Sequence, residues 1–226
     1  MDLEVHPGEV VGLIGESGCG KTTLVRTALG LLRRDGGEVR LLGEDPERLR
    51  GPAQARLRRR VQLLLQDPGA SLNPGLTVRQ TLHESARVHR PDTPGAVDEA
   101  LRRVDLTHRA EARPHELSGG ERRRATLAML WLADPLLTVA DEPTAGLDAA
   151  RKAELLDLLL SRRTPETGFL LISHDLPLVL YACSRVVVMS AGRLVDAFSP
   201  GELDATRCHP TTRRLLWASG MITEPA

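Results

Sequence analysis

A glycine-rich stretch near the start of the chain decides the fold: Gly15-Glu16-Ser17-Gly18-Cys19-Gly20-Lys21-Thr22. It fits the pattern G-x-x-x-x-G-K-[ST] and lies between a predicted strand, Val10 to Ile14, and a predicted helix that ends at Gly30. The glycines let successive backbone N–H groups point at phosphate oxygens at the positive end of that helix. We therefore predict a nucleotide phosphate site, in which Lys21 reaches the β- and γ-phosphates and the hydroxyl of Thr22 ligates Mg²⁺.

The alternative for this stretch is a glycine-rich turn that carries an exposed lysine. Of the 30 basic residues in the chain, only Lys21 and Lys152 are lysine, and the other 28 are arginine. A phosphate loop needs a compact ammonium, whereas the guanidinium of arginine is a broad planar fork. A rare lysine at this position therefore favours the phosphate site over the turn.

A second apolar run, Leu136 to Ala140, ends in two carboxylates and resembles a Walker B strand. We expect Asp141 to hold Mg²⁺, directly or through water. Glu142 lies one residue further and points elsewhere, so we expect it to polarise the attacking water. The alternative is that the two carboxylates only cap the helix that follows.

Composition and charge limit the class of protein. The chain has 226 residues, of which 41% are hydrophobic and 27% charged, which is typical of one globular domain. Its formal net charge is zero, so no strong field draws it to nucleic acid or to an anionic membrane. The longest apolar stretch, Thr126 to Val139, is interrupted by Asp134 and Pro135 and is too short to span a bilayer. The acidic Asp2 and Glu4 are unlike a signal peptide, and the three cysteines are far apart, so we expect a cytoplasmic protein with reduced thiols.

Short apolar runs alternate with helical patterns, which is typical of an α/β fold with a largely parallel sheet. Further predicted strands are Val39 to Leu42, Val61 to Leu65, Leu136 to Ala140, Phe169 to Ile172 and Val186 to Met189. Predicted helices are Val78 to Val88, Ala96 to Val104, Ala149 to Leu160 and Leu176 to Ala182. Helical patterns prevail between Pro68 and His115, which indicates an inserted helical lobe.

The phosphate loop and the carboxylate pair are shared by many nucleotide-binding proteins, so further residues must decide between classes. Asn73 is the only asparagine and no lysine follows it, which excludes the Asn-Lys-x-Asp guanine reader of Ras-type GTPases. The stretch Leu117-Ser118-Gly119-Gly120-Glu121 resembles the signature sequence of the ATP-binding cassette (ABC) ATPases. Taken alone, Ser118 is equally well explained as a helix N-cap with Glu121 as its capping-box partner.

Three further motifs stand in the order that this family has. Gln66 follows a predicted strand as the Q-loop does, Ala145 to Asp148 matches the D-loop, and His174 matches the switch histidine that senses the γ-phosphate. The resemblance extends from Gly8 to about Trp217, nearly the whole chain.

The resemblance implies a P-loop NTPase fold of ABC type: a mostly parallel RecA-like core (residues 1–66 and 121–226), a helical lobe (about 67–120) and a reduced N-terminal β-lobe. It implies an ATPase whose catalytic residues are Glu142, His174 and Gln66. The implied metal ligands are Thr22, Gln66 and Asp141. The implied ATP-binding residues are Gly15, Glu16, Ser17, Gly18, Cys19, Gly20, Lys21, Thr22, Thr23, Ser118, Gly119, Gly120 and Asp148.

By the same resemblance, the signature faces the phosphate loop of a second ATPase subunit, so that Ser118 and Gly120 serve a nucleotide bound to the partner. Gln66 to Pro74, Pro114 to Glu116 and His209 to Arg213 resemble the peptide, nickel and metallophore importers. This implies a subunit at the cytoplasmic face of the membrane, bound to permease subunits and served indirectly by a solute-binding protein. A homodimer and a pair of different ATPases are both compatible with the sequence.

One departure from the family concerns the base of the nucleotide. No aromatic residue precedes Gly15, whereas relatives stack adenine on an upstream aromatic side chain. Either the protein begins upstream of Met1 or its β-lobe is trimmed. The alternative functions are an ABC ATPase that serves a soluble complex and a regulatory module without turnover; the second is disfavoured because Lys21 and Glu142 are both present. We expect the arginine clusters at 58–60 and 122–124 to be solvated helix faces and predict no nucleic-acid partner.

Overall fold

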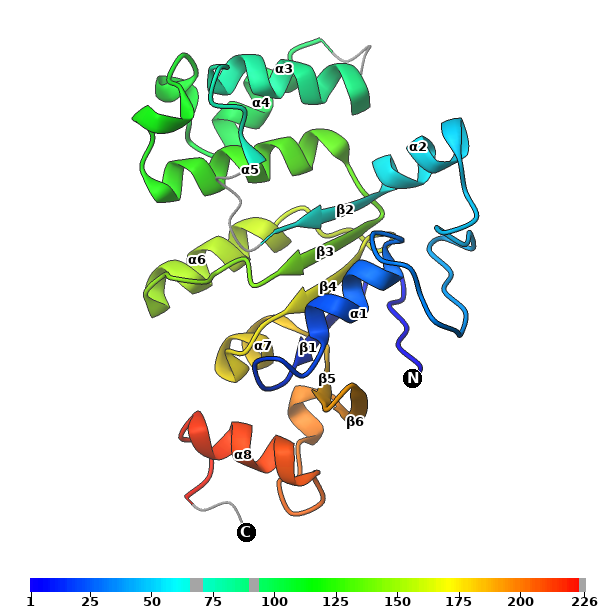
Figure 1. The fold of residues 1–226 in the computed structure, drawn as a ribbon. Coiled ribbons are helices and arrows are strands. Elements are labelled where there is room, and N and C mark those ends of the chain that lie inside the picture. The colour runs from blue at the N-terminus through cyan, green and yellow to red at the C-terminus, as the bar shows by residue number, and fades with distance from the viewer. Residues whose placement is uncertain (66–70, 90–93, 224–226) are drawn as a thin grey trace.

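The computed structural model describes residues 1–65, 71–89 and 94–223. Its centre is a six-stranded sheet in the order β2-β3-β4-β1-β5-β6 (Figure 1). The strands are β1 (Val10–Ile14), β2 (Val61–Leu64), β3 (Leu137–Asp141), β4 (Gly168–Ile172), β5 (Arg185–Ser190) and β6 (Arg193–Phe198). Neighbouring strands pair in parallel except for β6, which is antiparallel to β5. The predicted α/β fold with a mostly parallel sheet is confirmed.

Helices surround the sheet. They are α1 (Lys21–Ala28), α2 (Gly51–Arg60), α3 (Val78–His89), α4 (Ala96–Arg103), α5 (Gly119–Ala133), α6 (Ala149–Leu160), α7 (Leu176–Ala182) and α8 (Pro210–Ala218). Short 3₁₀ turns occur at Thr107–Arg109, Pro114–Glu116 and Pro200–Glu202. Helices α6 and α7 have the predicted bounds, and α3 and α4 differ by one residue. Among the described residues, no helix is both long and apolar enough to cross a membrane.

The two faces of the sheet pack against different helices because side chains alternate along each strand. Val11 and Leu13 of β1 share one apolar cluster with Val25 of α1. Val10 and Ile14 of the same strand belong to the other cluster, with residues of α5, α6 and α7. Strand β1, like its neighbour β4, is therefore buried on both faces, as the centre of a parallel sheet requires.

Helices α3, α4 and α5 form a separate group beyond the β2 edge of the sheet (Figure 1). Leu82 of α3, Leu101 of α4 and Leu127 of α5 are among its fully buried side chains. Helix α5 begins in this group and leads directly into β3, so the helical group and the sheet share one continuous apolar cluster.

The strand predicted at Val39 to Leu42 is wrong. Within residues 29–50, the backbone pairing is limited to an isolated antiparallel bridge between Leu41 and Glu44. Residues 1–9 contribute no strand beside it, and a strand without a partner cannot satisfy its backbone groups. The β-lobe is thus reduced even further than the sequence predicts.

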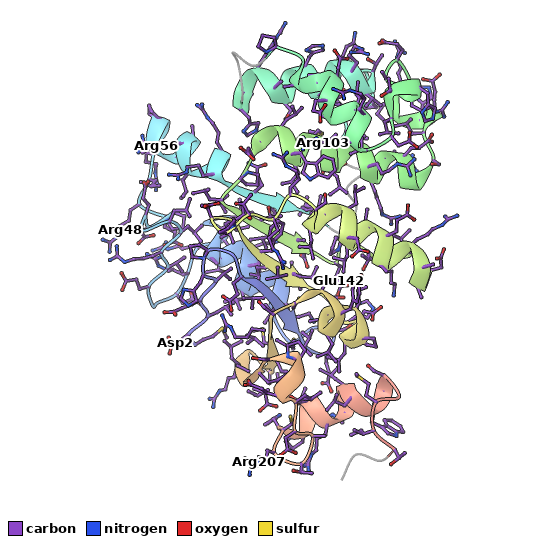
Figure 2. The ribbon with its side chains drawn as sticks, turned by 180° about the vertical axis from the view of Figure 1, so that it is seen from behind. Asp2, Arg48, Arg56, Arg103, Glu142 and Arg207 are labelled. Atoms are coloured by element: carbon purple, nitrogen blue, oxygen red, sulfur yellow. The ribbon has the colours of Figure 1, made fainter. Side chains whose placement is uncertain are left out.

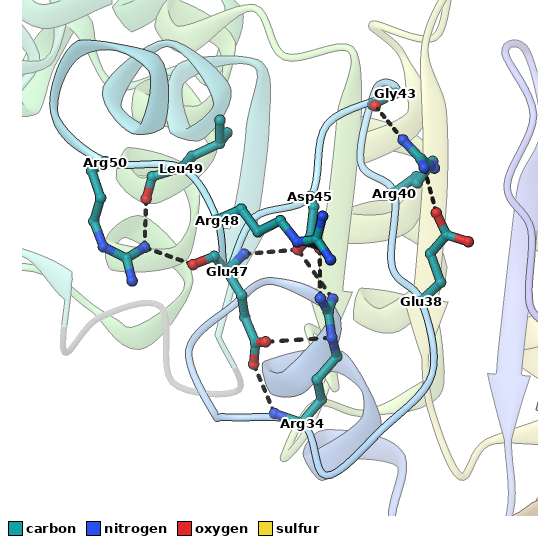
Figure 3. A network of polar contacts seen from close by, with 9 residues as sticks. All are labelled: Arg34, Glu38, Arg40, Gly43, Asp45, Glu47, Arg48, Leu49 and Arg50. Atoms are coloured by element: carbon teal, nitrogen blue, oxygen red, sulfur yellow. Dashed lines mark hydrogen bonds and ion pairs between the residues drawn. The ribbon is translucent and has the colours of Figure 1, made fainter.

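Ion pairs organise this irregular segment instead (Figure 3). The guanidinium of Arg34 lies 2.5 Å from Asp45 Oδ2 and 3.3 Å from Glu47 Oε2, and the backbone N–H of Arg34 donates to Glu47 Oε1 at 2.7 Å. The hydrogen bond from Arg34 holds the pKa of Asp45 below its usual value, although burial opposes it. Ion pairs between side chains thereby hold this segment in place, where a β-lobe would be held by backbone hydrogen bonds between strands.

Gly12, in the middle of β1, allows α7 to approach the sheet closely. A Cβ atom there would lie 2.2 Å from Cγ1 of Val179, which is fully buried, and 3.1 Å from the sulfur of Cys183. Burial also raises the pKa of the Cys183 thiol to about 12, consistent with an apolar contact between α7 and β1.

We predict that Gly12→Ala lowers the free energy of unfolding by about 1 to 3 kcal/mol, because the added methyl group overpacks a rigid core. Urea denaturation followed by circular dichroism measures the loss. Gly36→Ala is the matched control, since its Cβ would meet no atom within 4 Å. Equal stability of the two variants would contradict the close approach.

Candidate functional site

The site lies at the carboxyl ends of three adjacent parallel strands, β3, β4 and β1. Ile172 at the end of β4 is in register with Asp141 of β3 and with Leu13 of β1. The backbone N–H of Glu142 donates to the carbonyl of Ile172 at 2.9 Å, which fixes the turn after β3 against β4. The loops that carry the predicted residues therefore leave the sheet at one edge, where ligands of open α/β sheets bind.

The loop after β1 forms a backbone cradle. Gly18 and Gly20 have positive φ angles of +78° and +108°, which glycine adopts without steric cost. A Cβ atom on Gly15 would lie 2.3 Å from the carbonyl oxygen of Met189, whereas one on Gly18 would meet no atom within 4 Å. The loop is thus packed tightly against β5 on one side and open on the other. Glu16, Ser17 and Gly18 are exposed on that open side.

Lys21 is buried at the start of α1, and its ammonium lies inside the cradle. Its Nζ donates to the carbonyl oxygens of Gly15, at 2.7 Å, and Glu16, at 3.1 Å. These bonds hold a positive charge where the open N–H groups of the loop converge, so the donor set suits phosphate. Cys19 is half-buried beside the ammonium, and Thr23, one turn into α1, is exposed.

Thr22 and Asp141 are brought together, as predicted. The hydroxyl of Thr22 donates to Oδ2 of Asp141 at 3.2 Å, across 119 residues of sequence. A hydroxyl and a carboxylate are hard oxygen ligands of the kind that Mg²⁺ prefers. Among the described residues there is no cluster of three His, Cys, Asp or Glu side chains that would enclose a metal.

Glu142 and His174 also meet. Nδ1 of His174 lies 2.8 Å from Oε1 of Glu142 and, opposite an ionised carboxylate, must be the donor. The side chain of Glu142 is 15% exposed and that of His174 is 63% exposed. Glu142 has a φ of +49°, a left-handed conformation that is strained for a residue other than glycine. The turn after β3 thus directs this carboxylate to the sheet edge at a conformational cost.

The signature lies apart from the phosphate loop, at the start of α5 in the helical group (Figure 1). Ser118 is the N-cap: its hydroxyl accepts from the backbone N–H of Glu121 at 3.2 Å. Gly119 and Gly120 are exposed, and Cβ atoms there would meet nothing within 4 Å. The beginning of a 15-residue helix therefore presents bare N–H groups to solvent, beside a hollow of about 530 Å³.

The D-loop adjoins the signature helix. Asp148 is the N-cap of α6, where its carboxylate accepts from the backbone N–H of Arg151 at 3.1 Å. Arg123 of α5 donates from Nη2 to the carbonyl oxygen of Ala145 at 2.8 Å. The prediction that residues 122–124 form a solvated face is wrong: these arginines are half-buried, because the D-loop and the turn before the signature cover them. Arg58 to Arg60 are exposed, as predicted.

Gln66, predicted as a catalytic residue and metal ligand, lies outside the described residues. Conversely, the structure shows an ion pair that motif spacing did not predict. Nζ of Lys152 lies 2.5 Å from Oδ2 of Asp175, the residue after His174. The rarity of lysine in this chain was the signal for it, since Lys152 is the only lysine besides Lys21.

Comparison with known proteins agrees with this geometry. Residues 1–145 match the family described as ABC transporter. The chain belongs to this family. It is an ABC ATPase subunit, of the kind that binds ATP and hydrolyses it to power transport, and the family predicted from the signature and its companion motifs is confirmed.

Several relatives of this ABC subunit have named roles. Over 225 residues it is 39% identical to a Brucella ovis protein provisionally named a peptide import ATP-binding protein, with 96% of this chain and 71% of that protein covered. It is 36% identical to the oligopeptide transport ATP-binding protein OppF of Streptococcus mutans, with coverage of 100% and 74%. The cbiO1 structure from Clostridium perfringens, part of the ABC transporter complex cbiONQ, superposes with a TM-score of 0.80 at 27% identity, with coverage of 96% and 86%.

The ion pair of Lys152 and Asp175 anchors the loop that carries His174. Burial alone would raise the pKa of Asp175, but the hydrogen bonds from Lys152 and from the backbone of Leu178 outweigh it and hold that pKa below its usual value. A carboxyl with a depressed pKa in the folded state adds stability above its unfolded pKa of about 4, and this stability is lost as the pH falls below that value.

We predict that Lys152→Met destabilises the protein at neutral pH by on the order of 1 to 2 kcal/mol, because it leaves a half-buried carboxylate without its cation. The difference in stability from the wild type should narrow as the pH falls from about 4 through the lowered pKa of Asp175, below which this carboxyl is protonated in the folded wild type as well. Urea unfolding at several pH values measures it. Arg207→Met, which removes an exposed partner of Asp204, is the control and should change little at any pH.

Proposed function

We propose that this ABC subunit binds Mg²⁺-ATP at the sheet edge, activates water with Glu142, and powers the import of peptides. The proposal is carried by one observation. At the carboxyl ends of three adjacent strands lie Lys21, the Thr22–Asp141 pair and the Glu142–His174 pair. A site that only bound nucleotide would have no use for a carboxylate held in a strained turn beside a histidine.

Each residue has a role in this proposal. Backbone N–H groups of residues 15–20 and the ammonium of Lys21 neutralise the phosphates. Thr22 and Asp141 would hold the Mg²⁺, with Gln66 as a further ligand, and a bound ion would supply positive charge beside the phosphates. Glu142 orients and deprotonates the attacking water. His174 holds the Glu142 carboxylate in place and reaches the γ-phosphate when it is present.

Two such subunits act together in this proposal. The exposed N–H groups at Gly119 and Gly120 suit an anion, yet they lie in the helical group, away from the cradle of the same chain. A second ATPase subunit, identical or different, would place its nucleotide against Ser118, Gly119, Gly120 and Asp148. We accordingly divide the chain into a catalytic core of residues 1–66 and 121–226 and a helical lobe of about 67–120.

The names of the relatives support the proposed cargo and location. The Brucella ovis and Streptococcus mutans proteins are named for peptide and oligopeptide transport, and the GsiA protein of Pectobacterium atrosepticum, 37% identical with 96% of this chain and 36% of that protein covered, is named for glutathione import. We propose peptides as the cargo, with nickel or another metal chelate as the alternative. The subunit would sit at the cytoplasmic face of the membrane on permease subunits, and a solute-binding protein would deliver the cargo to those subunits.

We predict that Glu142→Gln keeps ATP binding but lowers turnover by at least about a hundredfold, because an amide cannot accept the proton of water. The variant should accumulate as an ATP-bound dimer. Phosphate release measures turnover, and light scattering with and without ATP measures the dimer. Glu166→Gln, an exposed change in the loop before β4, is the control. Hydrolysis at the wild-type rate by Glu142→Gln would remove Glu142 from the catalytic role.

The transport function is tested by purification from detergent-solubilised host membranes. Tagged Glu142→Gln protein with ATP is expected to recover polytopic membrane subunits together with a peptide-binding protein, as identified by mass spectrometry. Recovery of a metal-chelate-binding protein instead of a peptide-binding protein would support the transport function but overturn the proposal that the cargo is a peptide. Recovery of soluble enzymes or ribosomes without any membrane subunit would overturn transport.

A further inference from the structure

The capping box of the signature helix contains a carboxylate beside an anion-binding surface. Oε2 of Glu121 accepts from the backbone N–H of Ser118 at 2.7 Å, and the backbone N–H of Glu121 donates to the hydroxyl of Ser118 at 3.2 Å. The side chain of Glu121 is only 16% exposed. The carboxylate is therefore fixed within the same helical turn as the bare N–H groups of Gly119 and Gly120.

Arg109 contacts this carboxylate from the 3₁₀ turn Thr107–Arg109. Its Nε donates to Oε1 of Glu121 at 3.1 Å, and its Nη2 donates to the carbonyl oxygen of Glu116 at 2.6 Å. One guanidinium thus joins the cap of α5 to the turn that precedes the signature. The side chain of Arg109 is 35% exposed, so the pair lies at the surface of the helical group rather than in its core.

Glu121 stays ionised in this setting. The hydrogen bonds from the backbone and the side chain of Ser118 have the largest effect and lower its pKa, burial opposes them, and the charge and hydrogen bond of Arg109 lower the pKa by smaller amounts. An ionised carboxylate in the first turn repels a phosphate that approaches the same turn. It also accepts a hydrogen bond from the hydroxyl of Ser118, and so competes with a phosphate for the same hydroxyl hydrogen.

We propose that Arg109 is a positioning residue for nucleotide recognition at the signature. It neutralises Glu121 and occupies Oε1, so that the hydroxyl of Ser118 and the N–H groups of Gly119 and Gly120 are presented to the phosphates of a nucleotide held by a second subunit. This rests on the proposed function, in which the signature of one subunit faces the phosphate loop of the other. Arg109 acts through Glu121 and does not need to touch the nucleotide.

The test measures ATP-dependent dimer formation by light scattering, in the Glu142→Gln background so that hydrolysis does not interfere. Arg109→Ala is expected to raise the ATP concentration that gives half-maximal dimer formation by about tenfold. This is the effect on binding expected from one uncompensated charge near a protein surface. The shift should shrink at high salt, because screening weakens repulsion. The double variant Arg109→Ala/Glu121→Gln should return to within about threefold of the background protein.

Two further variants separate charge from structure. Arg103→Ala, on α4 (Figure 2), removes a similarly exposed arginine from an ion pair with Glu99 and should leave the ATP requirement unchanged. Arg109→Lys keeps the charge but not the fork that also reaches Glu116, and should stay close to the background protein. If Arg109→Ala does not fold, Arg109→Gln, which also removes the charge, takes its place in the comparison with Arg109→Lys and in the double variant with Glu121→Gln.

The proposal is overturned if Arg109→Ala behaves like Arg103→Ala, or if removing the Glu121 charge does not rescue it. A defect that Arg109→Lys shares in full would also overturn it, since a structural bridge would then explain the result. Absence of an ATP-dependent dimer in the Glu142→Gln background protein itself is a different failure, because it contradicts the proposed function and not the role of Arg109.

Discussion

The parallel hydrogen bonding of β1 to β4 and of β4 to β3 is the constraint on which the site depends. Because the three strands run in one direction and their ends are in register, the phosphate cradle, the Asp141–Glu142 turn and the His174 loop leave the sheet together. A one-residue slip of β3 against β4 would move the Asp141 carboxylate to the opposite face and break its contact with Thr22. Apolar layers on both faces of the sheet, including the close contact at Gly12, fix this register.

Arginine and lysine occupy different places relative to the site. The chain uses arginine for nearly all of its cations, and many of these form surface pairs such as those of Arg79 and Arg103. Its two lysines lie at the site instead. Lys21 fits between backbone carbonyls only 2.7 and 3.1 Å away, and Lys152 anchors the loop of His174 through Asp175. A planar guanidinium would not fit the first position without opening the cradle, so the choice of cation there is a matter of shape as well as charge.

The elements that sequence analysis predicted are those with a regular apolar pattern. Strands β1, β4 and β5 appear as apolar runs because their residues are buried on both faces, and α6 and α7 appear as helical patterns because their buried residues recur at helical spacing. Helix α2 escaped prediction because Leu57 is its only fully buried residue, and α8 because it buries Thr211 and Thr212 beside Leu216. The strand at Val39 to Leu42 was predicted from residue type alone, whereas a strand also needs a neighbour, and the segment Arg34 to Glu47 is held by ion pairs instead.

The residues of the site likewise fall into those that the sequence predicted and those that it did not. Lys21, Asp141 and Glu142 were predicted because each belongs to a motif that is short in sequence, consisting of one strand and the turn that follows it. Pairs such as Lys152–Asp175 and Arg109–Glu121 were not, because they join elements whose relative placement only the fold determines. Each of these ion pairs fixes the position of a segment that carries motif residues. The loop of His174 and the signature thus depend on partners outside their motifs. A variant that keeps every motif residue but loses such a partner has an intact motif and an altered site.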